Sequence, residues 1–214
     1  TGRSSAETRD IMESANIHSG IFMNGQVVLY RDQLVYSSEI PTETVEKFHQ
    51  MVKEDGYGLT AYNDKQFYLV ASSPGAKDAY GFIHSNPPAL NPDFYKENPI
   101  NMMLFISLPP AEEKYKVAFP NLDFLRNTPY SVDVISKGNS KAEGIKRFLE
   151  HLNQEDAKTY AFGDGPNDIE MLQAVSHPVA MGNALPILKE IAEFITTDNT
   201  NNGIVNGLKH YGLI

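Results

Sequence analysis

The sequence contains no cysteine among its 214 residues. This absence excludes disulfide bonds, thiolate catalysis, and zinc or iron–sulfur sites that depend on sulfur ligands. It also favours a reducing, cytoplasmic location. The sequence has no long hydrophobic run either. Its longest apolar stretch, residues 102–106, has the length of a strand and falls far short of the roughly 18 residues of a membrane span. We therefore expect no association with a membrane.

Basic residues are scarce as well. The 18 lysines and arginines are outnumbered by 27 aspartates and glutamates, which gives a net charge of −9. A protein that binds nucleic acid usually carries a basic patch, so this balance argues against a nucleic-acid partner. A small phosphorylated metabolite needs only one or two local cations and a metal ion. The composition is therefore compatible with such a substrate.

The last third of the chain alternates regularly between strand and helix patterns. The expected strands are residues 159–162, 179–181 and 195, and the expected helices are residues 141–152, 169–175 and 186–194. This alternation predicts an α/β fold with a parallel sheet that carries helices on its faces. In such sheets the ligand site lies beyond the carboxyl ends of the strands.

The middle of the chain follows a different pattern, which is rich in hairpins. After a first helix signalled by Ser4 and Glu7, strands are expected at residues 20–23, 27–30 and 34–36. A helix should begin at Pro41 and end at Gly56. A second hairpin is expected at residues 59–62 and 67–70, loops with one short helix at residues 72–99, and strands at residues 101–108 and 130–135. Residues 112–119 favour a helix, although an alternating strand also fits. This part looks like a separate module inserted into the parallel sheet.

The strongest chemical signal is Gly-Asp-Gly-Pro-Asn-Asp at residues 163–168, directly after an expected buried strand. Asp164 and Asp168 are carboxylates four residues apart in a tight turn, which suits a hard divalent cation with oxygen ligands. The alternative is purely structural: Asp164 makes the turn, and Asn167 or Asp168 caps the following helix.

A second signal is Lys141, at the start of a helix that Ser140 and Glu143 should cap. A cation there opposes the helix dipole, whereas an anion is favoured at the same helix end. The ammonium group makes sense if a phosphate lies between the two. The alternative is a solvated surface lysine.

A third, weaker signal is Thr1-Gly2-Arg3, which leads into a helix. A threonine hydroxyl and backbone N–H groups at a strand-to-helix turn can hold phosphate oxygens.

Together these motifs resemble those of the Cof-type haloacid-dehalogenase-like phosphatases. The motifs occur in the order and spacing of that family. They are Thr-Gly-Arg at residues 1–3, Asn-Gly at residues 24–25, Ser-Lys at residues 140–141, Gly-Asp-Gly-Pro-Asn-Asp at residues 163–168, Met-Gly-Asn-Ala at residues 181–184 and Asn-Gly at residues 202–203. The resemblance implies a Rossmann-like core made of residues 1–34 and 133–214. It also implies an α/β cap domain made of residues 35–132.

The resemblance also implies roles for individual residues. Lys141 would neutralise the phosphoryl oxygens, and Thr1 and Asn167 would help to bind the phosphate. Asp164 would be a direct ligand of Mg²⁺, and Asp168 would help to orient the metal's water shell. Asn183 lies near the site in the family, without an assigned role.

One motif of the family is not found in this sequence. The family's nucleophile and its acid–base residue are the two aspartates of a D-x-D-G-T motif, and no D-x-D occurs in the 214 residues. Asp10 falls in an expected helix and Asp32 in a hairpin turn, so neither replaces them. We expect that a strand–helix–strand unit is missing from the start of the sequence and that these residues alone are inactive.

For the complete enzyme, the resemblance implies magnesium-dependent hydrolysis of small phosphomonoesters, such as sugar phosphates, through an aspartyl-phosphate. Two alternatives stay open. One is a non-catalytic protein that binds a phosphorylated ligand, and the other is a phosphomutase.

Overall fold

The computed structural model describes residues 1–126 and 128–214. Its residue contacts divide into two compact units, Thr1–Asn139 and Ser140–Ile214. Both units combine helices and strands, with antiparallel sheets in the first unit and a parallel sheet in the second, which agrees with the fold class predicted from the sequence. The division into a core and a cap at residues 34/35 and 132/133 stays a prediction. Among the described residues, no helix has both the length and the apolar character that crossing a membrane requires.

The first unit begins with helix α1 (Ser5–Ser14) and a small antiparallel sheet. The Ser4 side chain accepts from the Glu7 backbone N–H, and the Glu7 side chain binds the Ser4 N–H in return, so the predicted capping box is present. The sheet contains β1 (Gly20–Phe22), β2 (Val27–Tyr30) and β3 (Gln33–Ser37). A single 3₁₀ turn, η1 (Met23–Gly25), connects β1 to β2.

The rest of the first unit is built around a five-stranded antiparallel sheet with the order β5-β4-β6-β8-β7. Its strands are β4 (Gly58–Tyr62), β5 (Phe67–Ala71), β6 (Met102–Ile106), β7 (Leu122–Leu125) and β8 (Ser131–Ser136). Its helices are α2 (Thr42–Asp55), α3 (Ala76–Phe82), α4 (Phe94–Glu97) and α5 (Glu112–Ala118).

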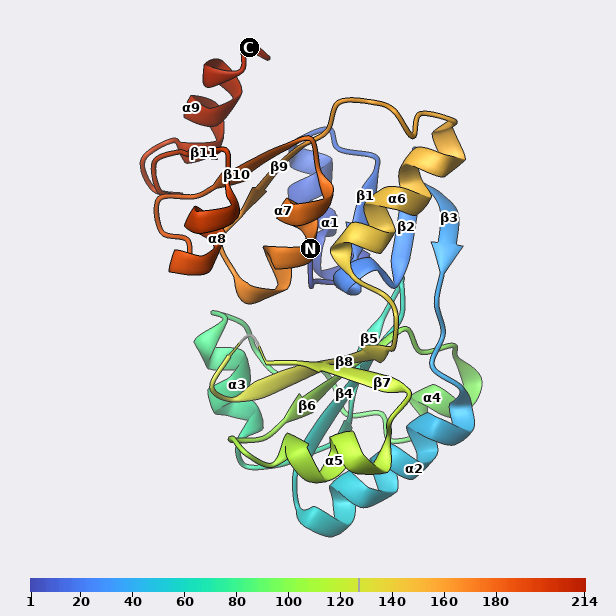
Figure 1. The fold of residues 1–214 in the computed structure, drawn as a ribbon. Coiled ribbons are helices and arrows are strands. Elements are labelled where there is room, and N and C mark those ends of the chain that lie inside the picture. The colour runs from blue at the N-terminus through green and yellow to red at the C-terminus, as the bar shows by residue number, and fades with distance from the viewer. Residues whose placement is uncertain (127) are drawn as a thin grey trace. The chain divides into compact units, whose positions relative to one another are not determined.

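The helices cover this sheet according to the alternation of its side chains. Val132 and Val134 of β8 belong to a buried cluster with Phe48 of α2 and Tyr115 of α5; these two helices run along one face of the sheet in Figure 1. Ile106 belongs instead to a cluster with three residues of α3, Ala76, Ala79 and Tyr80. Helix α2 has the predicted apolar face and ends at Gly56, whose φ of 74° is the left-handed conformation that glycine adopts at little cost.

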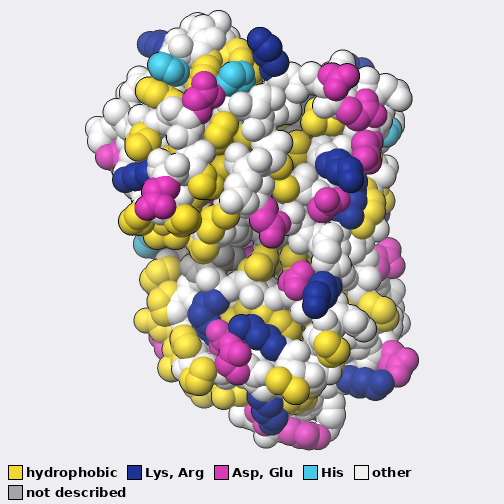
Figure 2. All heavy atoms as spheres, in the orientation of Figure 1, with side chains coloured by type: hydrophobic (Ala, Val, Ile, Leu, Met, Phe, Trp, Pro, Cys, Tyr) yellow, Lys and Arg dark blue, Asp and Glu magenta, His cyan; other side chains and the backbone are white. Residues whose placement is uncertain are grey.

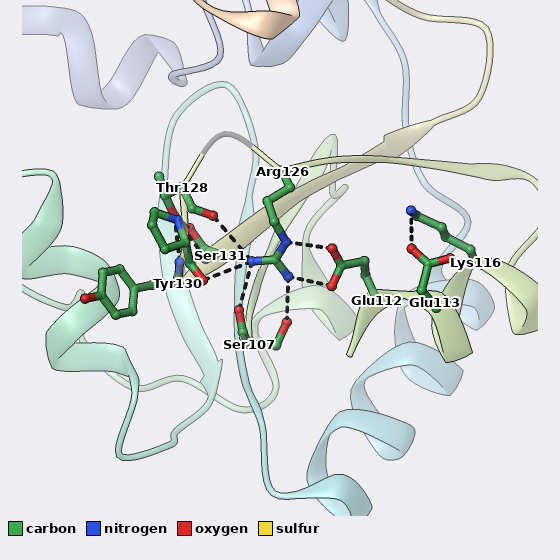
Figure 3. A network of polar contacts seen from close by, with 9 residues as sticks. Ser107, Glu112, Glu113, Lys116, Arg126, Thr128, Tyr130 and Ser131 are labelled. Atoms are coloured by element: carbon green, nitrogen blue, oxygen red, sulfur yellow. Dashed lines mark hydrogen bonds and ion pairs between the residues drawn. The ribbon is translucent and has the colours of Figure 1, made fainter. Parts of the chain in front are cut away.

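A largely buried ion pair joins the first residue of α5, Glu112, to Arg126 in the segment between β7 and β8 (Figure 3). Arg126 donates from Nε and Nη2 to the two carboxylate oxygens of Glu112, both at 2.6 Å. Its Nη1 donates to the backbone carbonyls of Ser107, Thr128 and Pro129 at 3.1–3.3 Å. The hydrogen bond from Arg126 outweighs burial and lowers the pKa of Glu112. One guanidinium therefore fixes two loops at the same end of the sheet.

The second unit contains the parallel sheet that the sequence predicted, with the order β11-β10-β9. Its strands are β9 (Tyr160–Gly163), β10 (His177–Ala180) and β11 (Phe194–Ile195). Its helical segments are α6 (Lys141–Leu152), η2 (Pro166–Asp168), α7 (Ile169–Ala174), α8 (Pro186–Ile191) and α9 (Gly203–His210). The buried cluster of this unit joins β9 and β10 to α7 and α8.

Three elements differ from the sequence prediction. Residues 72–99 contain two helices, α3 and α4, where one short helix was expected. Strand β7 and helix α9 were not predicted at all. Residues 112–118 of the segment 112–119 form a helix, which decides between the two alternatives. The buried Tyr115 packs against Phe48 of α2.

On the face shown in Figure 2, the dark blue Lys and Arg side chains lie among magenta Asp and Glu side chains. The described residues form no continuous basic patch on this face, so its charges are mixed in the way that the composition suggests.

Candidate functional site

The candidate site of the second unit is the turn that follows β9. Strands β9 and β10 are parallel, so the turn lies beyond the carboxyl end of β9, where ligand sites of such sheets occur. The Asp168 side chain folds back over the turn, and its Oδ2 accepts hydrogen bonds from the backbone N–H groups of Asp164 (3.0 Å) and Gly165 (3.1 Å). A Cβ on Gly163 would lie 2.7 Å from the Cβ of Asp168. Only glycine allows this close approach.

Lys141 and Asp168 form a buried ion pair. The Lys141 Nζ donates to Asp168 Oδ1 at 2.6 Å, and the two residues are 9% and 6% exposed. Burial alone would raise the pKa of Asp168. The charge and hydrogen bond of Lys141, together with the N–H groups of Gly165 and Asp164, outweigh burial and lower this pKa. The carboxylate of Asp168 is therefore the ionised partner that fixes both the ammonium group and the turn.

The position of Lys141 at the start of α6 is also explained by this pair. Ser140 caps the helix by accepting from the Glu143 backbone N–H, as predicted. A cation at this helix end is unfavourable by roughly 0.3–1 kcal/mol, and the Asp168 carboxylate offsets that cost. Because Lys141 is buried and paired, the alternative of a solvated surface lysine does not describe it.

Asp164 is exposed and has a partner that sequence reasoning missed. Asn183, in the loop between β10 and α8, donates from Nδ2 to Asp164 Oδ2 at 2.9 Å. Its Oδ1 accepts from the Asn199 backbone N–H at 3.2 Å. Asn183 therefore holds the Asp164 carboxylate and ties it to a third loop. The Met-Gly-Asn-Ala motif marked this residue in the sequence, but no pattern indicated which group it would contact.

The donor chemistry of Asp164 and Asp168 differs with respect to a metal ion. Among the described residues, no group of three or more His, Asp or Glu side chains gathers as a ready metal site. Asp164 offers an exposed carboxylate oxygen, the kind of ligand that hard divalent cations prefer. Both oxygens of Asp168 accept hydrogen bonds from Lys141 and the turn. Direct coordination therefore fits Asp164, whereas Asp168 fits only the outer role expected from the resemblance.

The remaining predicted residues are placed as follows. Asn167 lies half-buried in η2, next to Asp168 in the same turn. Thr1 belongs to the other unit, where its Oγ1 accepts from the Arg3 backbone N–H at 3.2 Å and its backbone carbonyl accepts from the Asn24 N–H at 3.0 Å. The second unit thus brings Lys141, Asp164, Asn167 and Asp168 together, and the Thr1 turn is a separate element of the first unit.

Comparisons with known proteins identify the family of the chain. A family model described as haloacid dehalogenase-like hydrolase matches residues 1–208. The Bacillus subtilis (strain 168) protein named "Putative phosphatase YkrA" is 36% identical over 215 residues, which cover 100% of this chain and 83% of that protein.

Two solved structures extend the comparison. A protein of Geobacillus kaustophilus HTA426 superposes with a TM-score of 0.91 at 32% identity, over 100% of this chain and 84% of that one. A sugar phosphatase of haloacid-dehalogenase subclass IIB superposes with a TM-score of 0.85 at 27% identity, over the same two shares.

The mixed α/β fold and the similarity to these proteins define the class of the chain. The chain belongs to the haloacid dehalogenase-like hydrolases and is a phosphatase of that family.

Proposed function

We propose that the protein is a magnesium-dependent phosphatase that hydrolyses small phosphomonoesters, sugar phosphates among them, through an aspartyl-phosphate. The observation that carries the proposal is the buried Lys141–Asp168 pair at the carboxyl end of β9. It is supported by the subclass IIB sugar phosphatase among the structural relatives.

In this proposal Lys141 binds the phosphoryl oxygens. An ammonium group has three N–H donors, and the bond to Asp168 uses one of them. Asp168 acts by positioning Lys141 and the turn, and Asn167 and the Thr1 hydroxyl bind further phosphate oxygens. Fixed donors of this kind stabilise the charge that develops on the equatorial oxygens of a transferred phosphoryl group.

Asp164 would hold the metal ion, with its carboxylate oriented by Asn183. Bound Mg²⁺ supplies charge stabilisation to the phosphoryl oxygens. The attacking carboxylate implied by the family resemblance is not among the 214 residues. We therefore propose that these residues alone bind a phosphorylated ligand without hydrolysing it. Phosphate release by the 214-residue chain itself would contradict this part of the proposal.

The experiment compares Asp164→Asn with Asp156→Asn in the natural protein, that is, the protein as its gene encodes it rather than the 214 residues alone. Asp156 is an exposed aspartate of the same unit and serves as the control. We expect Asp164→Asn to lower kcat/KM for a sugar phosphate by about a hundredfold or more, the loss of several kcal/mol of metal-based stabilisation. Calorimetric titration should also show weaker Mg²⁺ binding.

Two outcomes would support other functions. If phosphorylated ligands bind tightly but no inorganic phosphate is released by the natural protein, it is a binding protein. If the product is an isomeric sugar phosphate, it is a phosphomutase. Equal kinetic and Mg²⁺-binding constants for the two variants would remove Asp164 from the metal site.

A further inference from the structure

The 3₁₀ turn η1 holds three consecutive residues at positive φ. These are Met23 (49°), Asn24 (54°) and Gly25 (94°), and all three are buried. Positive φ is unfavourable for a residue with a side chain, most of all for a bulky one such as methionine. Such a conformation persists only where its surroundings hold it, and it is often found at functional sites.

The turn holds the backbone of the predicted phosphate-binding segment. The Asn24 N–H donates to the carbonyl oxygen of Thr1, and the Met23 N–H donates to that of Arg3, both at 3.0 Å. The path of the Thr1–Arg3 backbone is thus set by two consecutive amides of η1. Any shift of the turn would move the Thr1 hydroxyl and the neighbouring N–H groups.

The turn is itself held by β8 through two side chains on the same face of that strand. Asn24 is 1% exposed, and its Nδ2 donates to Asp133 Oδ2 at 3.0 Å. Two residues further along β8, Ile135 belongs to the same buried cluster as Met23. Val132 and Val134, on the other face, anchor β8 in the large aromatic cluster of the sheet. Asp133 therefore lies on a strand whose position is fixed by the packing of its two neighbours.

Gly2 fits tightly against this pair. A Cβ on Gly2 would lie 3.3 Å from Asp133 Oδ2 and 3.4 Å from the carboxamide of Asn24. The Asp133–Asn24 pair thus contacts the segment in two ways: through the backbone hydrogen bonds of η1 and by direct packing against Gly2.

We propose that Asp133 and Asn24 are positioning residues of the phosphatase, a hydrogen-bonded pair that fixes the phosphate-binding backbone of Thr1–Arg3. This inference rests on the proposed role of Thr1. A carboxylate close to bound phosphate repels it, so the charge of Asp133 is not a source of affinity. What Asp133 supplies is an acceptor oxygen for Asn24, and an amide in place of the carboxylate can supply the same acceptor.

The experiment uses the natural protein with Asp133→Leu, Asp133→Asn, Asn24→Gly and the double variant of Asp133→Leu with Asn24→Gly. Glycine keeps the positive φ at position 24 accessible, so this variant removes the carboxamide with little backbone strain. Asp133→Leu and Asn24→Gly should each raise the inhibition constant of inorganic phosphate by about tenfold, the equivalent of one lost hydrogen bond to a charged group. The double variant should be no worse than either single variant. Asp133→Asn should stay within about twofold of the wild type or bind phosphate more tightly.

Asp123→Leu is the matched control. Asp123 lies on the neighbouring strand β7, opposite Ile135, and its Oδ2 accepts from the Gly138 backbone N–H at 3.3 Å. This variant should lose stability without a change in the phosphate constant. If Asp123→Leu and Asp133→Leu raise that constant equally, or if the effects of Asp133→Leu and Asn24→Gly simply add, the pair has no positioning role.

A second measurement separates this inference from the proposed function. Hydrogen exchange of the Met23 and Asn24 amides should be about tenfold faster in Asp133→Leu than in the wild type, whether or not the protein hydrolyses phosphate esters. If the wild type neither binds inorganic phosphate nor hydrolyses phosphomonoesters, the proposed function fails, and this exchange rate decides whether the pair holds the segment. Unchanged exchange would overturn the inference.

Discussion

Replacement of Lys141 by methionine should destabilise the protein strongly, because it leaves a carboxylate buried without its counter-charge. The Lys141 and Asp168 side chains are 10% and 8% exposed. Removing one partner of a buried ion pair costs about 3–5 kcal/mol. Asp168 keeps the N–H groups of Asp164 and Gly165 as partners, so we expect a loss of about 3 kcal/mol, at the lower end of that range. For a chain of this length the loss corresponds to a fall in Tm of about 6–12 °C.

The assay is urea unfolding at neutral pH, with Lys146→Met as the control. Lys146 is exposed on the same helix α6, so the control makes the same chemical change without burying a charge. Adding Asp168→Asn to Lys141→Met should restore part of the lost stability, because the remaining group is then neutral. An unfolding free energy of Lys141→Met equal to that of Lys146→Met would refute the reasoning.

The pH dependence gives a second check. The pKa of Asp168 is lowered in the folded protein from its ordinary value of 3.8. A lowered carboxyl pKa contributes stability that is present above the unfolded pKa and is lost as the pH falls through the folded pKa. The stability difference between the wild type and Lys141→Met should therefore be constant near neutral pH and narrow below about pH 4.

Two further predictions concern packing. Arg126→Met leaves the Glu112 carboxylate, which is 9% exposed, without its partner. It should lower the free energy of unfolding in urea by about 2–3 kcal/mol. Adding Glu112→Gln should restore part of this loss, and a double variant no more stable than Arg126→Met would contradict the ion-pair explanation. Gly163→Ala should lower the stability by about 1–3 kcal/mol through its clash with Asp168. At Gly81 in helix α3 an added Cβ meets nothing within 4 Å, so Gly81→Ala should raise the free energy of unfolding by about 0.5–1 kcal/mol. Thermal unfolding measures both variants, and equal changes in Tm would contradict the explanation by local space.

The elements that could be predicted from the sequence are those whose buried positions carry apolar side chains. Helix α2 and the parallel strands are examples. Helix α9 was missed because the residues it buries are Gly203 and Gly207, while Ile204 and Val205 are exposed. The apolar residues of this eight-residue helix therefore do not mark its packed face, which is formed by glycines. Strand β7 was missed for a different reason: it has only four residues, and Asn and Pro residues stand within a few positions on both sides.

The candidate site was predictable as a set of residues but not as a set of contacts. The motif spacing placed Asp164 and Asp168 in one turn. It could not show that Asp168 pairs with Lys141, 27 residues away, because that contact depends on how α6 packs against the turn. It also gave no sign that Asn183 orients Asp164. Hydrogen bonds between residues that only tertiary packing brings together cannot be predicted from local sequence periodicity.

The strand order of the five-stranded sheet also bears on aggregation, because strands with unpaired edges can recruit other chains. The sheet ends at β5 and β7. The outer edge of β5 is already occupied: the Leu69 N–H donates to Ala89, and the Leu69 carbonyl accepts from Asn91. The other edge, β7, has only four residues. The segment that contains Ala89 and Asn91 therefore covers the β5 edge. The β7 edge is too short to offer another chain many backbone hydrogen bonds. Deleting residues 87–91 would expose the β5 edge and should make the protein prone to edge-to-edge association.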